Sequence, residues 1–212
     1  RPELQDVPTL VEKARAGLET TFPEVAGDKP LNLRVVIPEE LPWFLGLMEH
    51  LAAHGLTCPQ PVRGRDGQAL RHLAGRHAAI TTFLPGVWPR RVRPQHCAPL
   101  GAALAALHLA GAGYAPTRTN ALGPHGWPPL LTRALASPDA VEALQPGLAA
   151  ELQQAQTAIL AGWPTALPVG HIHADLFPDN VFFLDGRLSG LIDFYFAATD
   201  FLAYDIAICL NA

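Results

Sequence analysis

The feature that most constrains this chain is an ordered set of polar residues near its C-terminal end. His173, Asp175 and Asn180 form the pattern H-x-D-x-x-x-x-N, and Asp193 follows thirteen residues after Asn180. Asp and Asn often cap turns and strand ends by bonding nearby backbone N–H groups, so capping is an adequate explanation for any one of them. The ordered set of all four residues, His173 included, is much harder to obtain by capping.

A β-hairpin is predicted between Asn180 and Asp193. Residues 181–184 form an apolar strand, and residues 188–192 form the returning strand. The Asp-Gly pair at positions 185–186 is a strong tight-turn signal. Because the turn folds the chain back on itself, we expect the two ends of the hairpin to meet.

This order of residues suits phosphoryl transfer. That reaction needs a carboxylate to orient the attacking hydroxyl and accept its proton, and oxygen ligands to hold magnesium on the phosphates. In the protein-kinase pattern, the base Asp and an Asn five residues later share one loop, and a second Asp follows a short hairpin. Asp175, Asn180 and Asp193 occur in that order. The pattern therefore predicts a phosphotransferase with Asp175 as general base.

The composition is that of a chain with a substantial core. Its 212 residues suffice for one sizeable domain or two small lobes, and 49% are hydrophobic against 16% charged. No apolar run reaches the roughly 18 residues of a membrane span. The formal net charge of −4 gives no reason to expect a nucleic-acid surface. Cys58, Cys97 and Cys209 are odd in number and far apart, which favours reduced thiols in the cytoplasm over a disulfide framework or a zinc site.

Apolar periodicity predicts several further elements. The apolar residues that follow Pro146 have the spacing of a buried helical face. Helices are predicted over residues 2–21, 38–53, 99–110 and 139–144, from Pro146 onward, and over residues 206–210; strands are predicted over residues 31–37 and 77–84.

Two interpretations remain open for the segment that ends the strand at 77–84. In a two-lobed kinase this segment is the hinge, whose backbone groups bind adenine. The alternative is a core strand followed by a turn at Pro85-Gly86.

Several isolated polar residues are expected to have structural roles. His108 is predicted to be a helix histidine with a satisfied partner, because it has no companion at metal-ligand spacing. Asp205 either caps the final helix or braces the loop at Asp175. Arg118, Asn120 and Trp127 lie in a long connection, where they anchor the loop or contact substrate; anchoring is favoured for Trp127.

Two stretches carry a specific resemblance to a known family. HADLFPDNVFF at 173–183 and LIDFYFAATDFLAYDIAICLNA at 191–212 resemble the bacterial homoserine kinases of the aminoglycoside-phosphotransferase and choline-kinase superfamily. Supporting similarity lies at residues 41–56, 81–86 and 100–110, and in the R-x-N of residues 118–120. The resemblance runs from about Pro38 to the last residue.

The resemblance implies an α+β, protein-kinase-like two-lobed fold. Residues 1–84 would form a partial N-terminal lobe, and residues 85–212 a mostly helical catalytic lobe that contains the hairpin. The implied reaction transfers the γ-phosphate of ATP to the side-chain hydroxyl of homoserine, with Mg²⁺, in threonine biosynthesis. The implied partners are therefore ATP and one small-molecule substrate.

By matching position, the resemblance also assigns roles to individual residues. Asp175 would be the catalytic base, and His173 would hold the catalytic loop. Asn180 and Asp193 would bind magnesium. Phe83 and Leu84 would lie at the adenine-binding hinge.

The N-terminal region departs from the family. Residues 1–33 do not resemble the nucleotide-binding hairpin, no lysine matches the phosphate-contacting position, and the C-terminal helices that usually shape the substrate pocket are not seen. We therefore expect an atypical or incomplete N-terminal lobe and a truncated C-terminus. Two other functions stay open: another small-molecule kinase, of the aminoglycoside or choline type, and an inactive kinase-like fragment.

Overall fold

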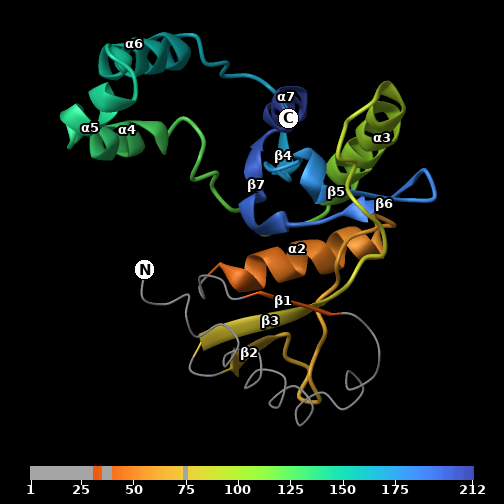
Figure 1. Cartoon of the computed structure of the whole chain (residues 1–212). Coiled ribbons are helices and arrows are strands. Elements are labelled where there is room, and N and C mark those ends of the chain that lie inside the picture. The colour runs from red at the N-terminus through yellow and green to blue at the C-terminus, as the bar shows by residue number, and fades with distance from the viewer. Residues whose placement is uncertain (1–30, 35–39, 74–75) are drawn as a thin grey trace.

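The computed structural model describes residues 31–34, 40–73 and 76–212. Helix α2 lies between a three-stranded sheet and a larger C-terminal part, and helices α4 to α6 extend to one side of that part (Figure 1). The structure is α+β, as predicted. The helix predicted over 2–21 and positions 35–37 of the first predicted strand lie outside the described residues.

The sheet of the N-terminal part has the order β1-β3-β2, with both pairs antiparallel. Its bounds are β1 (Leu31–Arg34), β2 (Leu70–Leu73) and β3 (Arg76–Thr82). The central strand β3 buries Ala78, Ala79 and Ile80. The strand predicted over 77–84 is correct in place but ends at Thr82, opposite Leu31 at the start of β1.

Helix α2 (Leu41–Ala53) connects the sheet to the rest of the molecule. Its apolar positions recur at helical spacing and are buried: Leu41, Phe44, Leu45, Leu47, Met48 and Leu51. The helix ends as predicted, because Gly55 adopts a left-handed conformation with φ of +91° that ordinary residues avoid. After Gly55 the chain folds back on the helix, and Leu56 N donates a hydrogen bond to Leu51 O at 3.0 Å, which closes the helix end.

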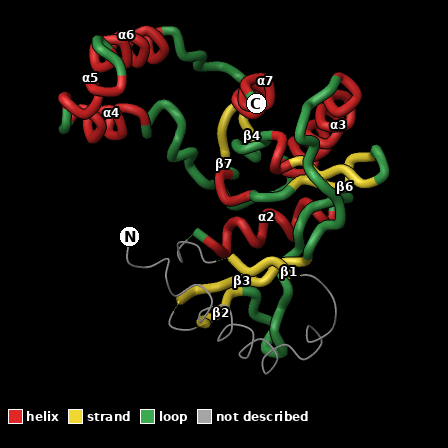
Figure 2. The backbone as a smooth tube through the Cα atoms, in the orientation of Figure 1, coloured by secondary structure: helices red, strands yellow, loops and turns green. Residues whose placement is uncertain are grey.

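The C-terminal part consists of two strand pairs packed on helix α3. Strand β4 pairs antiparallel with β7, and β5 pairs antiparallel with β6 (Figure 2). The bounds are α3 (Pro94–Gly111), β4 (Val169–Ile172), η3 (Pro178–Asn180), β5 (Val181–Leu184), β6 (Arg187–Leu191), η4 (Phe194–Phe196), β7 (Ala198–Phe201) and α7 (Leu202–Asn211). The predicted hairpin is confirmed as β5 and β6, with its turn at Asp185 and Gly186.

One buried cluster spans both parts of the molecule. It joins α2 (Phe44, Met48, Leu51) to α3 (Leu104, Leu107) and to the segment around the hairpin (Leu176, Val181, Leu191, Phe194). Burial of these side chains contributes roughly 25 cal/mol per Å² of apolar surface removed from water. Core residues therefore lie between the polar residues His173, Asp175, Asn180 and Asp193 along the chain, and their packing fixes where these polar residues lie.

Helices α4 (Trp127–Leu135), α5 (Pro138–Leu144) and α6 (Leu148–Ala161) pack mainly on one another. The prediction of a buried face on the helix after Pro146 is wrong. In α6 the exposed fractions are 38% for Leu152, 48% for Ile159 and 36% for Leu160. The predicted helix is present, but among the described residues mainly α4 and α5 pack against α6, and they leave much of its surface in solvent.

Several helices differ from the sequence prediction, including α2, which begins at Leu41 and not at 38. Helix α3 begins at Pro94, whereas the sequence predicts a start at Pro99, which lies inside the helix. The final helix begins at Leu202 and not at 206, because β7 leads directly into it. Helix α4 was not predicted; its two prolines, Pro128 and Pro129, lie in the first turn, where a missing N–H costs no helical hydrogen bond.

No helix in the part of the chain that the structure describes is long and apolar enough to cross a membrane.

Gly190 is required by a close backbone approach within the hairpin. Its φ is +155°, and an added Cβ would lie 2.7 Å from Thr57 O and 2.6 Å from a methyl carbon of Leu84. We expect Gly190→Ala to lower the free energy of unfolding by about 1–3 kcal/mol, because the backbone of Thr57 cannot yield cheaply. Urea unfolding checks this.

Gly101→Ala is the matched control for that substitution. Gly101 lies within α3, and an added Cβ there meets open space. Since Ala is a better helix former, this variant should be up to about 1 kcal/mol more stable than the parent. Equal stability of the two variants would refute the close-approach explanation.

Candidate active site

The loop formed by residues 173–180 holds the predicted H-x-D-x-x-x-x-N pattern, and we call it the catalytic loop. Strand β4 delivers the chain to it, and η3 closes it. Ala174, directly before Asp175, has φ of 62°, an uncommon conformation for a residue with a side chain. Such strained positions persist only where the surroundings impose them.

Asn180 ties the end of the catalytic loop to its centre. The amide nitrogen Nδ2 donates to the backbone O of Asp175 at 2.7 Å and to its carboxylate Oδ2 at 2.9 Å. Asn180 is buried, so this geometry is fixed. Because both bonds use the nitrogen, the amide oxygen faces away from Asp175.

Asp193 follows the returning strand of the hairpin and lies against the catalytic loop. The backbone of the preceding residue, Ile192, makes two hydrogen bonds to the catalytic loop. Its N donates to Asn180 O at 3.0 Å, and its O accepts from His173 Nε2 at 2.9 Å. Asp193 itself has φ of 66°. The ends of the hairpin therefore meet, as the sequence predicted.

Asp193 also borders the N-terminal part. It lines a small recess of about 20 Å³ together with Met48 of α2, Thr81 of β3 and the aromatic residues Phe194 and Tyr195 of η4. This carboxylate therefore lies where the two parts of the molecule meet.

The environment of Asp175 raises the pKa of its carboxyl group above the ordinary value. Partial burial is the main cause, and the negative charges of Asp193 and Asp179 add to it, while the hydrogen bond from Asn180 acts in the opposite direction. A raised pKa makes the Asp175 carboxylate a better proton acceptor than a free aspartate.

His173 has a fully buried ring that holds the hairpin in place. Its Nε2 contacts the backbone O of Ile192 at 2.9 Å, so this nitrogen carries the proton, and burial lowers the pKa of the imidazole. The other nitrogen, Nδ1, is buried without a hydrogen-bond partner among the described residues. This geometry suits a residue that positions the loop, which is the role the resemblance implies for His173.

Asp205 braces the catalytic loop from α7. Its completely buried carboxylate accepts hydrogen bonds from His173 N and Ala174 N, both at 2.9 Å. His108 Nε2 of α3 lies 3.0 Å from the same carboxylate. The bracing alternative for Asp205 and the prediction of a satisfied His108 are both confirmed.

Phe83 and Leu84 lie in the short segment between β3 and α3. Phe83 is 46% exposed, whereas the side chain of Leu84 approaches Gly190 of the hairpin. After Gly86 the chain bonds to the hairpin itself, from Val87 N to Phe183 O at 2.9 Å. The predicted hinge segment is thus next to the hairpin that carries Asn180 and Asp193; its role in binding adenine stays a prediction.

The long connection before α4 is anchored at three points. Arg118 donates to Ala197 O at 2.9 Å and to Glu40 at 2.6 Å. Asn120 Nδ2 donates to Asp200 Oδ2 at 2.8 Å. Trp127 Nε1 donates to Leu122 O at 2.6 Å, which confirms the anchoring role favoured for it.

Arg118 and Asn120 also line a recess of about 800 Å³, together with Asp200, His125 and Thr199. The sequence gives no signal that Glu40 pairs with Arg118 or Asp200 with Asn120, because the partners are about eighty positions apart.

Residues 29–212 match the model of a phosphotransferase enzyme family. The chain belongs to this family. The match covers the catalytic loop, the hairpin and every described helix, so the geometry above is that of a phosphotransferase domain. This agrees with the superfamily that the sequence resembles.

The phosphotransferase is similar to curated homoserine kinases. It is 67% identical over 204 residues to that of Granulibacter bethesdensis and, over the same number, to that of Acidiphilium cryptum; each match covers 95% of this chain and 62% of the relative. It is 64% identical over 206 residues to that of Gluconacetobacter diazotrophicus. The chain therefore spans somewhat less than two thirds of the length of these relatives.

Solved structures confirm the kinase-like fold. An amicoumacin kinase in complex with AMP-PNP, Ca²⁺ and Ami superposes with a TM-score of 0.69 at 17% identity, covering 85% of this chain and 56% of that one. A spectinomycin phosphotransferase in complex with ADP and spectinomycin gives a TM-score of 0.67 at 13% identity, covering 85% and 61%. At these identities the similarity concerns the fold.

Proposed function

We propose that this phosphotransferase domain transfers the γ-phosphate of ATP to the hydroxyl of homoserine, as in threonine biosynthesis. One observation carries the proposal: Asn180 bonds the Asp175 carboxylate at 2.9 Å and, through its backbone O, the residue before Asp193 at 3.0 Å, in a chain 67% identical to homoserine kinases over 204 residues. The three free cysteines favour a reducing compartment, so we place the reaction in the cytoplasm.

In this proposal Asp175 is the catalytic base and His173 positions its loop. The acceptor hydroxyl donates its proton to the Asp175 carboxylate as its oxygen attacks the γ-phosphorus. The bond between that phosphorus and the oxygen bridging to the β-phosphate breaks, and ADP leaves. Positioning and charge stabilisation supply most of the catalysis in such a reaction.

Asn180 and Asp193 would hold Mg²⁺, and their chemistry fits. The Asn180 amide turns its nitrogen to Asp175, so its oxygen remains on the side away from that residue. No group of three or more His, Cys, Asp or Glu in the described part of the chain has metal-site geometry. Mg²⁺ does not require one, because it binds through one or two protein oxygens, phosphate oxygens and water. When bound, the ion neutralises charge on the phosphates.

The hinge segment at Phe83 and Leu84 would hold adenine through its backbone. Support comes from its place beside the hairpin, through the contact of Leu84 with Gly190. The nucleotide would then extend from this segment toward Asp193, which borders both parts of the molecule.

An acceptor panel tests the substrate. The chain is incubated with MgATP and homoserine, choline or an aminoglycoside, and ADP formation is followed with a coupled assay. We expect homoserine to give the largest kcat/KM. A higher value for choline or the aminoglycoside would overturn the choice of substrate while leaving phosphoryl transfer intact, and nucleotide binding without transfer to any acceptor would argue against both.

The pH dependence of kcat/KM should report the raised pKa of Asp175. The base works only when ionised, so the rate falls as pH drops through this pKa, and the acid limb should lie above the ordinary aspartate value of about 3.9. Asp179→Asn removes one of the charges that raise this pKa and should move the acid limb to lower pH. An acid limb that does not move in this variant would contradict the assignment.

A further inference from the structure

The position of Asp193 depends on how the short helix η4 (Phe194–Phe196) that follows it is held. Asp193 has φ of 66°, and a side-chain-bearing residue keeps such a conformation only where its surroundings impose it. The start of η4 is anchored by Phe194, which is buried with its ring centroid 4.5 Å from that of His173. What anchors the far end of η4 therefore also bears on where the Asp193 carboxylate lies.

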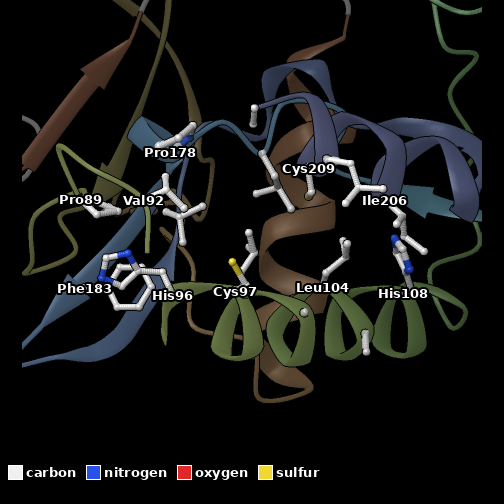
Figure 3. Close-up of a pocket in the computed structure, with 17 residues that line it drawn as sticks. Pro89, Val92, His96, Cys97, Leu104, His108, Pro178, Phe183, Ile206 and Cys209 are labelled. Atoms are coloured by element: carbon white, nitrogen blue, oxygen red, sulfur yellow. The ribbon is translucent and has the colours of Figure 1, made fainter. Parts of the chain in front are cut away.

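The apolar groove between α3 and α7 does not supply that anchor. This groove, of about 400 Å³, borders the catalytic loop at Pro178 and the hairpin at Phe183 (Figure 3). None of its lining residues is Asp, Glu, Lys or Arg, and none comes from residues 184–205. The groove thus packs the loop and the hairpin, and the restraint on the end of η4 lies elsewhere.

Arg118 joins the end of η4 to the start of α2. Its Nη1 donates to Ala197 O at 2.9 Å, and its Nη2 donates to Glu40 Oε2 at 2.6 Å. Ala197 is the residue that ends η4, and Glu40 is the N-cap residue of α2. One guanidinium therefore bridges two elements that are far apart in the sequence.

The same guanidinium stacks on an aromatic pair that links the two elements. Its Cζ lies 4.7 Å from the ring centroid of Phe44 in α2. The Phe44 ring in turn meets Tyr195 of η4 edge-on, with centroids 5.6 Å apart. Because a guanidinium is planar and carries several donors, it can stack on a ring and donate in two directions at once, which a lysine ammonium cannot do.

The energetics of Arg118 favour a role in geometry over a role in stability. Its side chain is only 15% exposed, and its Nε is buried without a hydrogen-bond partner among the described residues. Desolvation of a buried charge offsets much of what its ion pair contributes. Glu40 is 47% exposed, so solvent also screens the attraction between the two.

We propose that Arg118 is a positioning residue for Asp193, acting by clamping η4 against α2. The inference rests on the proposed function, in which Asp193 holds Mg²⁺. Helix α2 also reaches the same carboxylate directly, because its Met48 lines the small recess that contains Asp193 and Thr81 of β3. The clamp therefore fixes Asp193 relative to the N-terminal part of the molecule.

Hydrogen exchange tests the clamp without any ligand. Arg118→Met keeps a long side chain against Phe44 but removes the guanidinium, while the backbone N of residue 118 can keep its bond to Thr199 Oγ1. The Ala197 amide, which donates to Phe194 O at 3.0 Å in the parent, reports opening of η4. In peptides that cover residues 194–201, exchange at this amide should be at least about fivefold faster in the variant.

The Mg²⁺ requirement for nucleotide binding tests the consequence for Asp193. The Mg²⁺ concentration for half-maximal binding of a fluorescent ATP analogue should rise at least about fivefold in Arg118→Met. Arg118→Lys keeps the charge with a single point of contact and should lie between the parent and Arg118→Met. A residue that only supported the fold would leave this concentration unchanged at temperatures where the variants are folded.

Arg63→Met is the matched control. Arg63 also forms an ion pair with a glutamate of α2, from its Nη2 to Glu49 Oε2 at 2.6 Å, and its other hydrogen bond goes to Gly67 O and not to η4. This variant should show the parental exchange at residues 194–201 and the parental Mg²⁺ requirement. An effect equal to that of Arg118→Met would overturn the proposal, since general loosening of α2 would then explain both.

The remaining outcomes separate this inference from the proposed function. Parental exchange or a parental Mg²⁺ requirement in Arg118→Met, in a chain whose parent binds the nucleotide with Mg²⁺, overturns the clamp alone. A parent that binds the nucleotide equally well without Mg²⁺ contradicts the proposed roles of Asn180 and Asp193, and the role of Arg118 falls with them.

Discussion

Asp175→Asn should lower kcat for ADP formation about 10²–10⁴-fold while leaving the fold intact. A general base typically contributes about 10²–10⁴-fold in rate, and the amide cannot take the hydroxyl proton. The oxygen of the introduced amide can still accept a hydrogen bond from Asn180 Nδ2, which in the parent reaches the Asp175 carboxylate at 2.9 Å. The loss should appear in kcat with little change in nucleotide affinity, since in its proposed role as base the carboxylate acts on the acceptor.

The same variant should be at least as stable as the parent at neutral pH. Burial and the neighbouring charges raise the pKa of Asp175, so its ionised form is disfavoured in the folded state. The stability contribution of a group with a raised pKa is present at low pH and is lost as pH rises through that pKa. Removing the charge should therefore raise the melting temperature slightly, as happens where function and stability conflict.

Asp185→Asn is the control for this experiment, because it makes the same change in the exposed turn of the hairpin. It should retain parental activity. Parental ADP formation by Asp175→Asn would exclude Asp175 as the base. A large fall in its melting temperature would show that the carboxylate is structural.

Asp205→Ala should cause the largest loss of stability of any single substitution discussed for this chain. The carboxylate is 0% exposed and accepts from two backbone N–H groups, with His108 as a third partner. Removing one member of such a buried network leaves the others unpaired, at a cost of about 3–5 kcal/mol. Urea denaturation should show this as a lower midpoint.

Asp205→Asn distinguishes the hydrogen bonds of Asp205 to the catalytic loop from the space that its side chain fills. In the parent, His173 N donates to Oδ2 and Ala174 N to Oδ1, so the amide keeps an oxygen for one of these two donors and part of the stability should return. Asp179→Asn is the control, since that side chain is exposed and surface changes usually stay within about 0.5 kcal/mol. Parental stability of Asp205→Ala would contradict the assigned role.

The catalytic loop and hairpin could be predicted because the residues that determine them lie close together in the sequence. The spacing from His173 to Asn180 and the Asp-Gly turn are visible within one short stretch that ends at Asp193, and the hairpin formed where the turn chemistry required. The bracing role of Asp205 could be offered only as one of two alternatives, since its donors at His173 and Ala174 are more than thirty positions away.

Tertiary packing decided what the sequence left open or predicted wrongly. Period alone predicted a buried face on α6, but burial depends on which elements cover the helix, and Ile159 remains 48% exposed. The pairing of Arg118 with Glu40 joins positions that no local pattern connects. The sequence predicts that α3 begins at Pro99, because proline is common at helix starts, but Pro94 is the first residue and Pro99 lies inside the helix.

Metal-dependent nucleotide binding tests whether Asn180 and Asp193 form one site with Asp175. A fluorescent ATP analogue is titrated into the chain with and without Mg²⁺, and into Asp193→Asn. If these side chains hold the metal together, binding should require Mg²⁺ and should be weakened at least about tenfold in the variant. Binding that is independent of Mg²⁺, or equally tight in Asp193→Asn, would contradict this arrangement.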